Sequence, residues 1–220
     1  MNIARTFFFI TCITVLSCKK ETIINTGTNP SEGNYSCLKP GNYWIYRDYV
    51  INVAAGSINE ENTFDSCYIE KDTSINGNIF YKYTTVENIY GFTPHTYSYY
   101  LRDSLSYIVS DNGRIYFSST DFTNIFKTYT FGPNNSTGDT MIVTEQMGVK
   151  DAVIDVPAGS FKVSAFSIIF HYPPNRAAIS ASQDTWYAKN VGIISRSKGF
   201  YIVAADVFHE QKLVRYHVNN

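Results

Sequence analysis

The chain has 220 residues, which is the length of one domain or of two small ones. Charged residues make up 17% of it and aromatic residues 16%, with 18 Tyr and 15 Phe, whereas a disordered chain is rich in charge and poor in aromatics. The formal net charge of −1 provides no basic field, so we expect no nucleic-acid partner.

The N-terminus has the features of an export signal. Arg5 is the only charged residue before Lys19, and the apolar run between them is shorter than the ~20 residues that a transmembrane helix needs. The run ends in Val15-Leu16-Ser17-Cys18, which resembles the lipobox of bacterial lipoproteins. That resemblance implies cleavage of residues 1–17 and a diacylglycerol on the Cys18 sulfur, with palmitate-like acyl chains as the membrane anchor. A plain signal peptide with a chance Cys is the alternative.

The next segment, residues 18–36, is polar and has no periodic apolar pattern, which predicts a flexible tether. We expect a single β domain over residues 37–220. Under enterobacterial rules an Asp directly after the lipidated Cys retains a lipoprotein in the inner membrane. Here that position holds Lys19, so we expect an outer-membrane anchor. The choice between the periplasmic and the surface face stays open.

Two cysteines, Cys37 and Cys67, remain in the exported part of the chain after Cys18. An oxidising compartment favours a disulfide between them. Two buried thiols that never meet are the alternative. Neither cysteine lies in a CxxC pair, so a zinc ribbon or a redox motif is not indicated.

From Tyr43 onward the pattern is that of short strands rich in Tyr, Ile, Val and Phe, separated by turn residues. The expected strands are Tyr43–Val53, Phe64–Lys71, Ile79–Val86, Tyr97–Arg102, Ser106–Ser110, Arg114–Ser118, Lys127–Phe131, Thr140–Glu145, Ala152–Val156, Phe161–Tyr172, Thr185–Ala188, Gly192–Ser197, Tyr201–Phe208 and Leu213–Val218. Asn76-Gly77 predicts a tight hairpin because both turn residues need positive φ. Asp111-Asn112-Gly113 predicts a second.

Helix is scarce in this pattern. Ser119–Ile125, which Asp121 could cap, and Pro174–Ser182 are the only plausible helical turns. Strands and helices do not alternate, so a parallel sheet is not expected. The predicted fold is all-β: an antiparallel, open or curled β-barrel, with a β-sandwich as the alternative.

Three stretches carry a family resemblance. Gly41–Tyr46 (GNYWIY), Val156–Val163 (VPAGSFKV) and Trp186–Ile194 (WYAKNVGII) are similar to the G-N-x-W-x-Y, V-P-A-G-T-F-x-V and W-Y-A-x-x-V-G-x-V segments of uncharacterised Bacteroidetes lipoproteins. The resemblance implies a sheet curled into an open barrel, similar to periplasmic lipoprotein carriers. It implies no activity and no catalytic residues.

No motif for catalysis, metal or cofactor stands out. The four His show no HExxH spacing, and the chain lacks GxSxG, GxGxxG, GxxxxGK[ST] and DxDxDG patterns. We therefore expect no enzyme activity, no metal site and no cofactor. The two carboxylates of a glycoside hydrolase would be paired in space, however, and such a pair leaves no pattern in the sequence.

Two functions remain open. The first is a non-catalytic binding module for a hydrophobic or glycan ligand. Its candidate lining is Trp44, Tyr81, Tyr83, Tyr99 and Trp186. The alternative is a structural or interaction subunit of an outer-membrane protein complex, whose partner is an envelope protein. A continuous apolar cavity of roughly 300 Å³ or more would favour the first function, and an interior filled by side chains would favour the second.

Overall fold

The computed structural model describes residues 34–88, 94–132, 140–173, 180–198 and 207–219. These residues form thirteen antiparallel strands and no helix, so none of their segments is a helix that could cross a membrane. The strands are β1 (Tyr43–Asn52), β2 (Ser57–Ile75), β3 (Asn78–Glu87), β4 (His95–Ser104), β5 (Tyr107–Ser110), β6 (Ile115–Ser118), β7 (Ile125–Phe131), β8 (Met141–Met147), β9 (Ala152–Val156), β10 (Gly159–His171), β11 (Ser180–Ala188), β12 (Gly192–Lys198) and β13 (Val207–His217).

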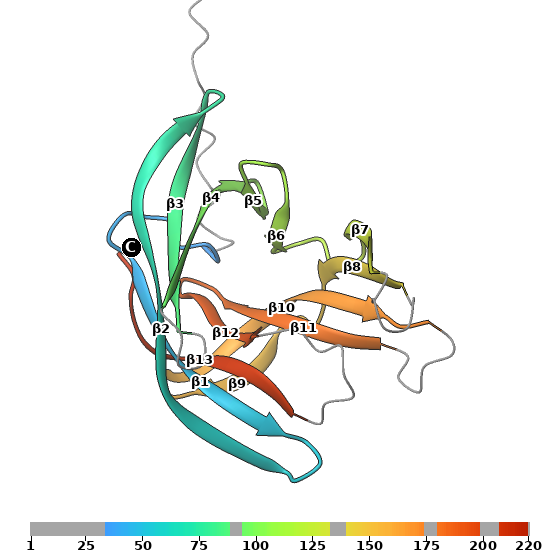
Figure 1. Cartoon of the computed structure of the whole chain (residues 1–220). Helices are drawn as coiled ribbons and strands as arrows, with labels where there is room; N and C mark the ends of the chain where they lie inside the picture. The colour runs from blue at the N-terminus through green and yellow to red at the C-terminus, as the bar shows by residue number, and fades with distance from the viewer. Residues whose placement is uncertain (1–33, 89–93, 133–139, 174–179, 199–206, 220) are drawn as a thin grey trace, which may run out of the picture.

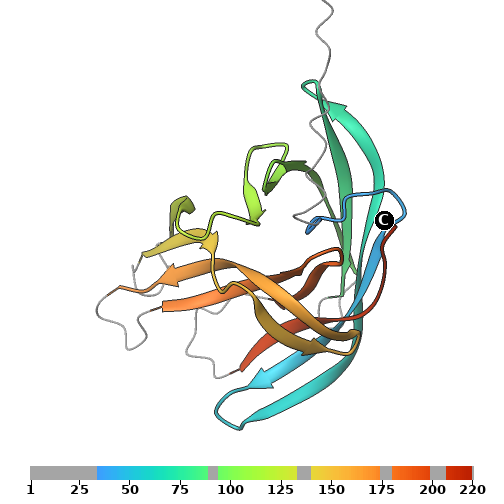
Figure 2. The ribbon, with the colours of Figure 1, turned by 180° about the vertical axis from the view of Figure 1, so that it is seen from behind.

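All thirteen strands belong to one sheet, in the order β6-β5-β4-β3-β2-β1-β13-β12-β11-β10-β8-β7, and β9 pairs with β10. The sheet curls until β6 contacts β8 and β10, so that the barrel is nearly closed (Figure 1). Seen from behind, β2 runs along most of the height of the molecule and bends with the sheet (Figure 2). The prediction of a curled antiparallel barrel is confirmed, and the β-sandwich alternative is wrong.

Side chains close the barrel where the main chain does not. Arg114, just before β6, donates from Nε and Nη2 to the two carboxylate oxygens of Glu145 on β8, at 3.0 and 2.9 Å. The Ser118 amide on β6 lies 3.1 Å from the sulfur of Met147 on β8. These contacts hold the short edge strand β6 against the opposite side of the sheet.

Both predicted tight turns are present. Asn76 and Gly77 have φ of 50° and 78° and connect β2 to β3, as the I′ geometry of an Asn-Gly hairpin requires. Gly113, with φ of 83°, donates its amide to the Ser110 carbonyl at 2.9 Å in the turn between β5 and β6.

The structure corrects three predicted elements. β2 begins at Ser57 because its polar first half pairs with β1, where Ser57 lies opposite Asn52. β13 is one strand and not two, because its middle residues pair with β1 on one side and with β12 on the other. Ser119–Ile125 is not helical, although Asp121 accepts hydrogen bonds from the Thr123 and Asn124 amides.

The remaining helical prediction, Pro174–Ser182, is wrong where it can be compared, because β11 already begins at Ser180. Its residues 174–179, and residues 201–206 of the predicted strand Tyr201–Phe208, lie outside the described residues.

Candidate functional site

A cavity of about 130 Å³ lies inside the curled sheet. Its aromatic lining is Tyr35, Trp44, Tyr83, Tyr99, Tyr116 and Tyr187. The rest of the lining is aliphatic (Leu38, Leu101, Ile108, Ile193) or polar (Ser36, Thr185, Arg196). The cavity is thus mostly apolar and much smaller than the roughly 300 Å³ at which ligand pockets usually begin.

Strand alternation brings these side chains to the inner face. Trp44 on β1 is buried, and Tyr83 on β3 pairs directly with Tyr99 on β4. Thr185 and Tyr187 on β11 are two residues apart and therefore face the same way. Because these strands curl around a common interior, residues far apart in the sequence converge on the cavity.

The structure brings together three of the five predicted lining residues: Trp44, Tyr83 and Tyr99. Trp186 does not line the cavity, because it neighbours Tyr187 on β11 and successive side chains point to opposite faces. Tyr81 is half-buried against the core, two cross-strand pairs nearer the tip of the β2–β3 hairpin than Tyr83, and does not line the cavity.

Ten of the thirteen lining residues were missed by the sequence analysis, among them Tyr116, Thr185, Tyr187 and Arg196. All four lie in predicted strands, so alternation could have assigned each to one of two faces. Which face is the inner one depends on the curvature and register of the sheet, and neither is visible in one sequence.

The aromatic wall is held by main-chain contacts. The Trp44 indole Nε1 donates to the Val191 carbonyl at 2.6 Å, and the Tyr46 hydroxyl donates to the Ile193 carbonyl at 3.0 Å. Gly192 lies against the Trp44 indole. Since the Trp44 ring is fixed by the turn that it faces, this part of the cavity wall is preformed.

Tyr83 lines the cavity, but its hydroxyl is not accessible from it. Its side chain is buried, and within the described part of the chain its hydroxyl makes no hydrogen bond. Burial raises the pKa of Tyr83 well above its ordinary value, and the nearby Cys67 thiol and Tyr46 hydroxyl add to the rise. A buried hydroxyl without a partner costs free energy, and this one is closed off from the cavity as well as from bulk water.

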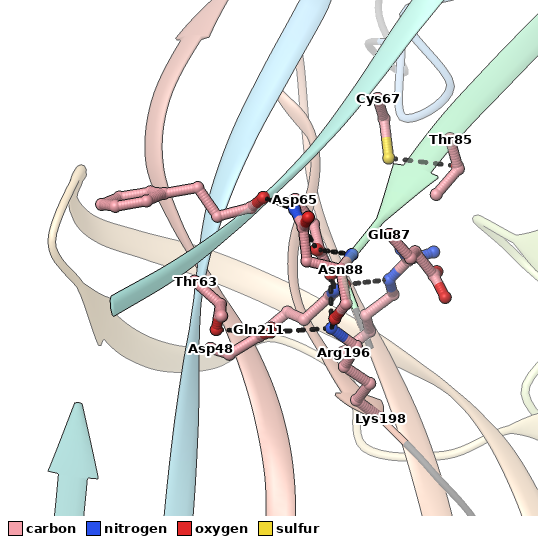
Figure 3. Close-up of polar contacts among 11 residues, drawn as sticks. Asp48, Thr63, Asp65, Cys67, Thr85, Glu87, Asn88, Arg196, Lys198 and Gln211 are labelled. Atoms are coloured by element: carbon pink, nitrogen blue, oxygen red, sulfur yellow. Dashed lines mark hydrogen bonds and ion pairs between the residues drawn. The ribbon is translucent and has the colours of Figure 1, made fainter. Parts of the chain in front are cut away.

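An ionic network joins β12 to the strands opposite (Figure 3). Arg196 donates from Nη2 to Glu87 at 2.7 Å and from Nε to the side-chain oxygen of Gln211, which in turn donates to Asp65. Lys198 Nζ lies 2.7 Å from Asp48 and 2.6 Å from Asp65.

Burial and pairing compete in this network. Burial raises the pKa of Asp48 above its ordinary value, because it outweighs the hydrogen bond from Lys198. Burial alone would lower the pKa of Lys198, but the hydrogen bonds to Asp48 and Asp65 outweigh burial. The pKa of Lys198 is therefore raised above its ordinary value. Counted formally, the three carboxylates (Asp48, Asp65, Glu87) exceed the two cations (Arg196, Lys198) by one.

The possible disulfide between Cys37 and Cys67 is not formed. Both are buried free thiols. The Cys67 sulfur lies 3.2 Å from the Thr85 hydroxyl (Figure 3), and the Cys37 thiol donates to the Asn34 carbonyl at 3.7 Å. Burial raises the pKa of Cys37 to about 12, so its thiolate, the form that reacts, is scarce at neutral pH.

A second hollow, of about 370 Å³, lies between the β2–β3 turn and the β5–β6 turn. Phe80 and Arg102, which line it, are one position away from the cavity-side pair Tyr81 and Leu101, so the hollow opens on the other face of the sheet. Much of its lining consists of turn residues such as Asn76 and Asp111, so it is not the apolar cavity expected of a lipid carrier.

The described residues hold no group of three or more His, Cys, Asp and Glu that could bind a metal. The predicted lipidation site, Cys18, lies outside the described residues together with the whole of the predicted signal.

No family model and no curated protein matches the chain. Among solved structures, a "putative lipoprotein" from Parabacteroides distasonis is similar over 84% of this chain and 99% of its own, with a TM-score of 0.51 and 12% identity. This likeness establishes the fold. A "putative exported protein with YmcC-like fold" from Bacteroides fragilis covers the same shares, at 11% identity and a TM-score of 0.45. The family resemblance carried by the three sequence motifs stays a prediction.

Proposed function

We propose that the protein is a lipid-anchored lipoprotein of the bacterial cell envelope whose domain acts as a non-catalytic binding module. The observation that carries the anchor is the sequence Val15-Leu16-Ser17-Cys18 at the end of a short apolar run. The fold of the domain supports the proposal, because a protein named as a putative lipoprotein has a similar curled sheet.

The cavity narrows the ligand class. A volume of about 130 Å³ does not accommodate an acyl chain of a lipid carrier's cargo, so a long hydrophobic ligand is not supported. The mostly apolar lining is also a poor match for a sugar ring with hydroxyls on every side. The binding module that we propose therefore takes a small molecule.

Metabolic labelling tests the anchor. Cells that express the full chain and are fed a labelled palmitate analogue should label the protein, and globomycin should leave the uncut precursor. Cys18→Ala should abolish labelling. Cys12→Ala, which changes the cysteine inside the cleaved leader, should not. Equal labelling of Cys18→Ala would contradict the proposal. Density-gradient separation of the two membranes then tests the expected outer-membrane location, and protease shaving of intact cells tests the face.

Native mass spectrometry tests the binding module. Protein isolated from envelopes of a host that expresses it should carry a bound mass that is lost when the protein is denatured. A mass spectrum with no bound species, even with candidate small molecules added at high concentration, would contradict the binding role.

The alternative is an interaction subunit, and the edge strand β7 is the observation that favours it. Among the described strands β7 pairs with β8 alone, and Ile125 at its start and Ile142 on β8 are exposed. A photo-crosslinker at Thr128 on β7 should capture one defined envelope protein in living cells, whereas one at the exposed Leu105 should not. Equal capture at both positions would count against this function.

A further inference from the structure

We infer that Lys198 and Asp65 become joined by an isopeptide bond, an amide between their side chains, and that Asp48 carries the protons of this reaction. The folded domain would make this modification on itself, with the loss of one water molecule. The inference goes beyond the proposed function and does not depend on it. It is carried by the contact distances, the burial of the three side chains, the donor at Asp65 and the unbonded oxygen of Asp48.

The fold brings the three side chains together from distant strands. Asp48 lies on β1, Asp65 on β2 and Lys198 at the end of β12. The Lys198 Nζ atom is 2.6 Å from Asp65 Oδ2 and 2.7 Å from Asp48 Oδ2 (Figure 3). One amine is thus within hydrogen-bond distance of two carboxylates, as a reacting group and a general acid or base must be. Reacting groups that the fold holds in contact react far faster than the same groups free in solution.

Burial removes these side chains from bulk water. The side chains of Asp65, Asp48 and Lys198 are 0%, 4% and 16% exposed. In the resting contact Lys198 is an ammonium group, because its two carboxylate partners raise its pKa. Its hydrogen bond to Asp48 gives one proton a path to a carboxylate whose own pKa is raised by burial. Transfer of that proton leaves a neutral amine, the form of lysine that is a nucleophile.

The two carboxylates differ in their other partners, and this difference assigns their roles. Asp65 Oδ1 accepts the Asn88 main-chain amide at 2.6 Å, so a donor already lies where negative charge develops when an amine adds to the carboxyl carbon. Asp48 Oδ1 is buried and has no hydrogen bond within the described part of the chain. A buried oxygen without a donor disfavours the carboxylate form. Asp65 is therefore the electrophile and Asp48 the proton carrier.

The reaction yields the amide and water alone. Lys198 passes one proton to Asp48, and after rotation about the Cε–Nζ bond its lone pair attacks Cγ of Asp65. The new C–N bond forms as the C=O electron pair moves to Oδ1. Asp48 then gives its proton to Oδ2 and relays a second proton from the nitrogen to the same oxygen. The C–Oδ2 bond breaks to release water, and Asp48 ends as the carboxylate that it was at the start.

Lys82 and Glu70 provide a comparison within the same chain. Lys82 Nζ is equally close to its carboxylate, at 2.6 Å, but the two side chains are 25% and 38% exposed. Among the described residues no second carboxylate pairs with Lys82. This pair has the required distance but neither the burial nor the proton carrier, so we expect it to remain an ion pair.

Peptide mapping of the full chain, purified from membranes in dodecyl maltoside, tests the inference. Trypsin does not cut after a lysine whose Nζ is part of an amide, so residues 197–212 should stay in one peptide. That peptide should be joined to residues 48–71 and weigh one water molecule less than the two peptides together. Fragmentation in the mass spectrometer should place the link between Lys198 and Asp65. Cleavage after Lys82 should be normal.

Two variants separate the roles of the residues. Lys198→Arg keeps the cation but has no amine that can form this bond, so it should abolish the linked peptide. Asp48→Asn keeps Lys198 and Asp65 and should lower the yield of linked peptide at least about tenfold, in protein of the same age. Glu87→Gln is the matched control, because Glu87 belongs to the same ionic network but pairs with Arg196, and it should leave the yield unchanged. Circular dichroism checks that each variant is folded, and the map of the wild-type chain decides the outcome if one is not.

Complete cleavage after Lys198 in the wild-type chain would overturn the inference. A link to Asp48 in place of Asp65, or an unchanged yield of linked peptide in folded Asp48→Asn, would overturn it as well. None of these results bears on the lipid anchor, which palmitate labelling tests, or on a ligand in the cavity, which native mass spectrometry tests.

Discussion

Gly192 shows how one residue connects the turn before β12 to the cavity wall. Its φ is +94°, in the region that L side chains rarely adopt, and a Cβ there would lie 3.2 Å from the Trp44 indole. The β11–β12 register shifts a few residues away, between Trp186 and Tyr187. The glycine is required both by the backbone and by the ring that packs on it.

Gly192→Ala should therefore lower the free energy of unfolding by about 2 to 4 kcal/mol, the sum of left-handed strain and overpacking against Trp44. Urea unfolding followed by circular dichroism measures the change. Gly77→Ala is the control, because Gly77 has a φ of +78° but no heavy atom within 4 Å of the added Cβ, and it should cost only about 1 kcal/mol. Equal losses in the two variants would show that the contact with Trp44 adds nothing.

The choice between Trp186 and Tyr187 marks the limit of sequence reasoning at the residue scale. Both are large aromatic residues on one predicted strand, and alternation says only that they face opposite ways. The structure assigns Tyr187 to the cavity and packs Trp186 elsewhere against the core. The sequence analysis proposed Trp186, but the face is decided by the register with neighbouring strands.

At the scale of elements, the closure of the barrel depends on Arg114 and Glu145. The Glu145 side chain is only 2% exposed, and the two-point hydrogen bond from Arg114 pairs both of its oxygens. A buried carboxylate that loses its partner is far more costly than an exposed one. This pair therefore does what main-chain hydrogen bonds do elsewhere in the sheet.

Arg114→Met should lower the free energy of unfolding by about 3 kcal/mol, because it leaves Glu145 buried and unpaired. The double variant Arg114→Met/Glu145→Leu should recover most of this loss, because the unpaired charge is gone. Denaturant titrations of the wild type, both single variants and the double variant give the coupling free energy.

Lys162→Met provides the comparison for this cycle. Lys162 pairs with Asp151 at 3.3 Å, but the two side chains are 68% and 51% exposed. Exposed pairs contribute little, so the change should be below about 0.5 kcal/mol. A loss of unfolding free energy as large as that of Arg114→Met would mean that burial does not decide how much these ion pairs contribute to stability.

For the whole molecule, the buried tyrosines predict instability in alkali. Burial raises the pKa values of Tyr46, Tyr83 and Tyr187, and Arg196, which would lower them, is outweighed. Above pH ~10 the unfolded chain releases these protons while the folded chain keeps them. Stability from these groups is complete below pH ~10 and is lost as the pH rises further.

Each of the three tyrosines should contribute about 1.4 kcal/mol per pH unit to the decline in the free energy of unfolding. Urea midpoints between pH 8 and 11.5, with phenolate absorbance to count released protons, measure the slope. Tyr187→Phe should reduce the slope by about 1.4 kcal/mol per pH unit. An unchanged slope would show that Tyr187 ionises in the folded protein.

The sequence by itself determined the strand content, the two tight turns and the all-β class, because side-chain alternation and the need for positive φ are local properties. It placed Trp44, Tyr83 and Tyr99 on strands but could not say that they meet. Curvature, register and the closure through Arg114 and Glu145 are long-range, and they alone decided which face became the interior and how small the cavity is.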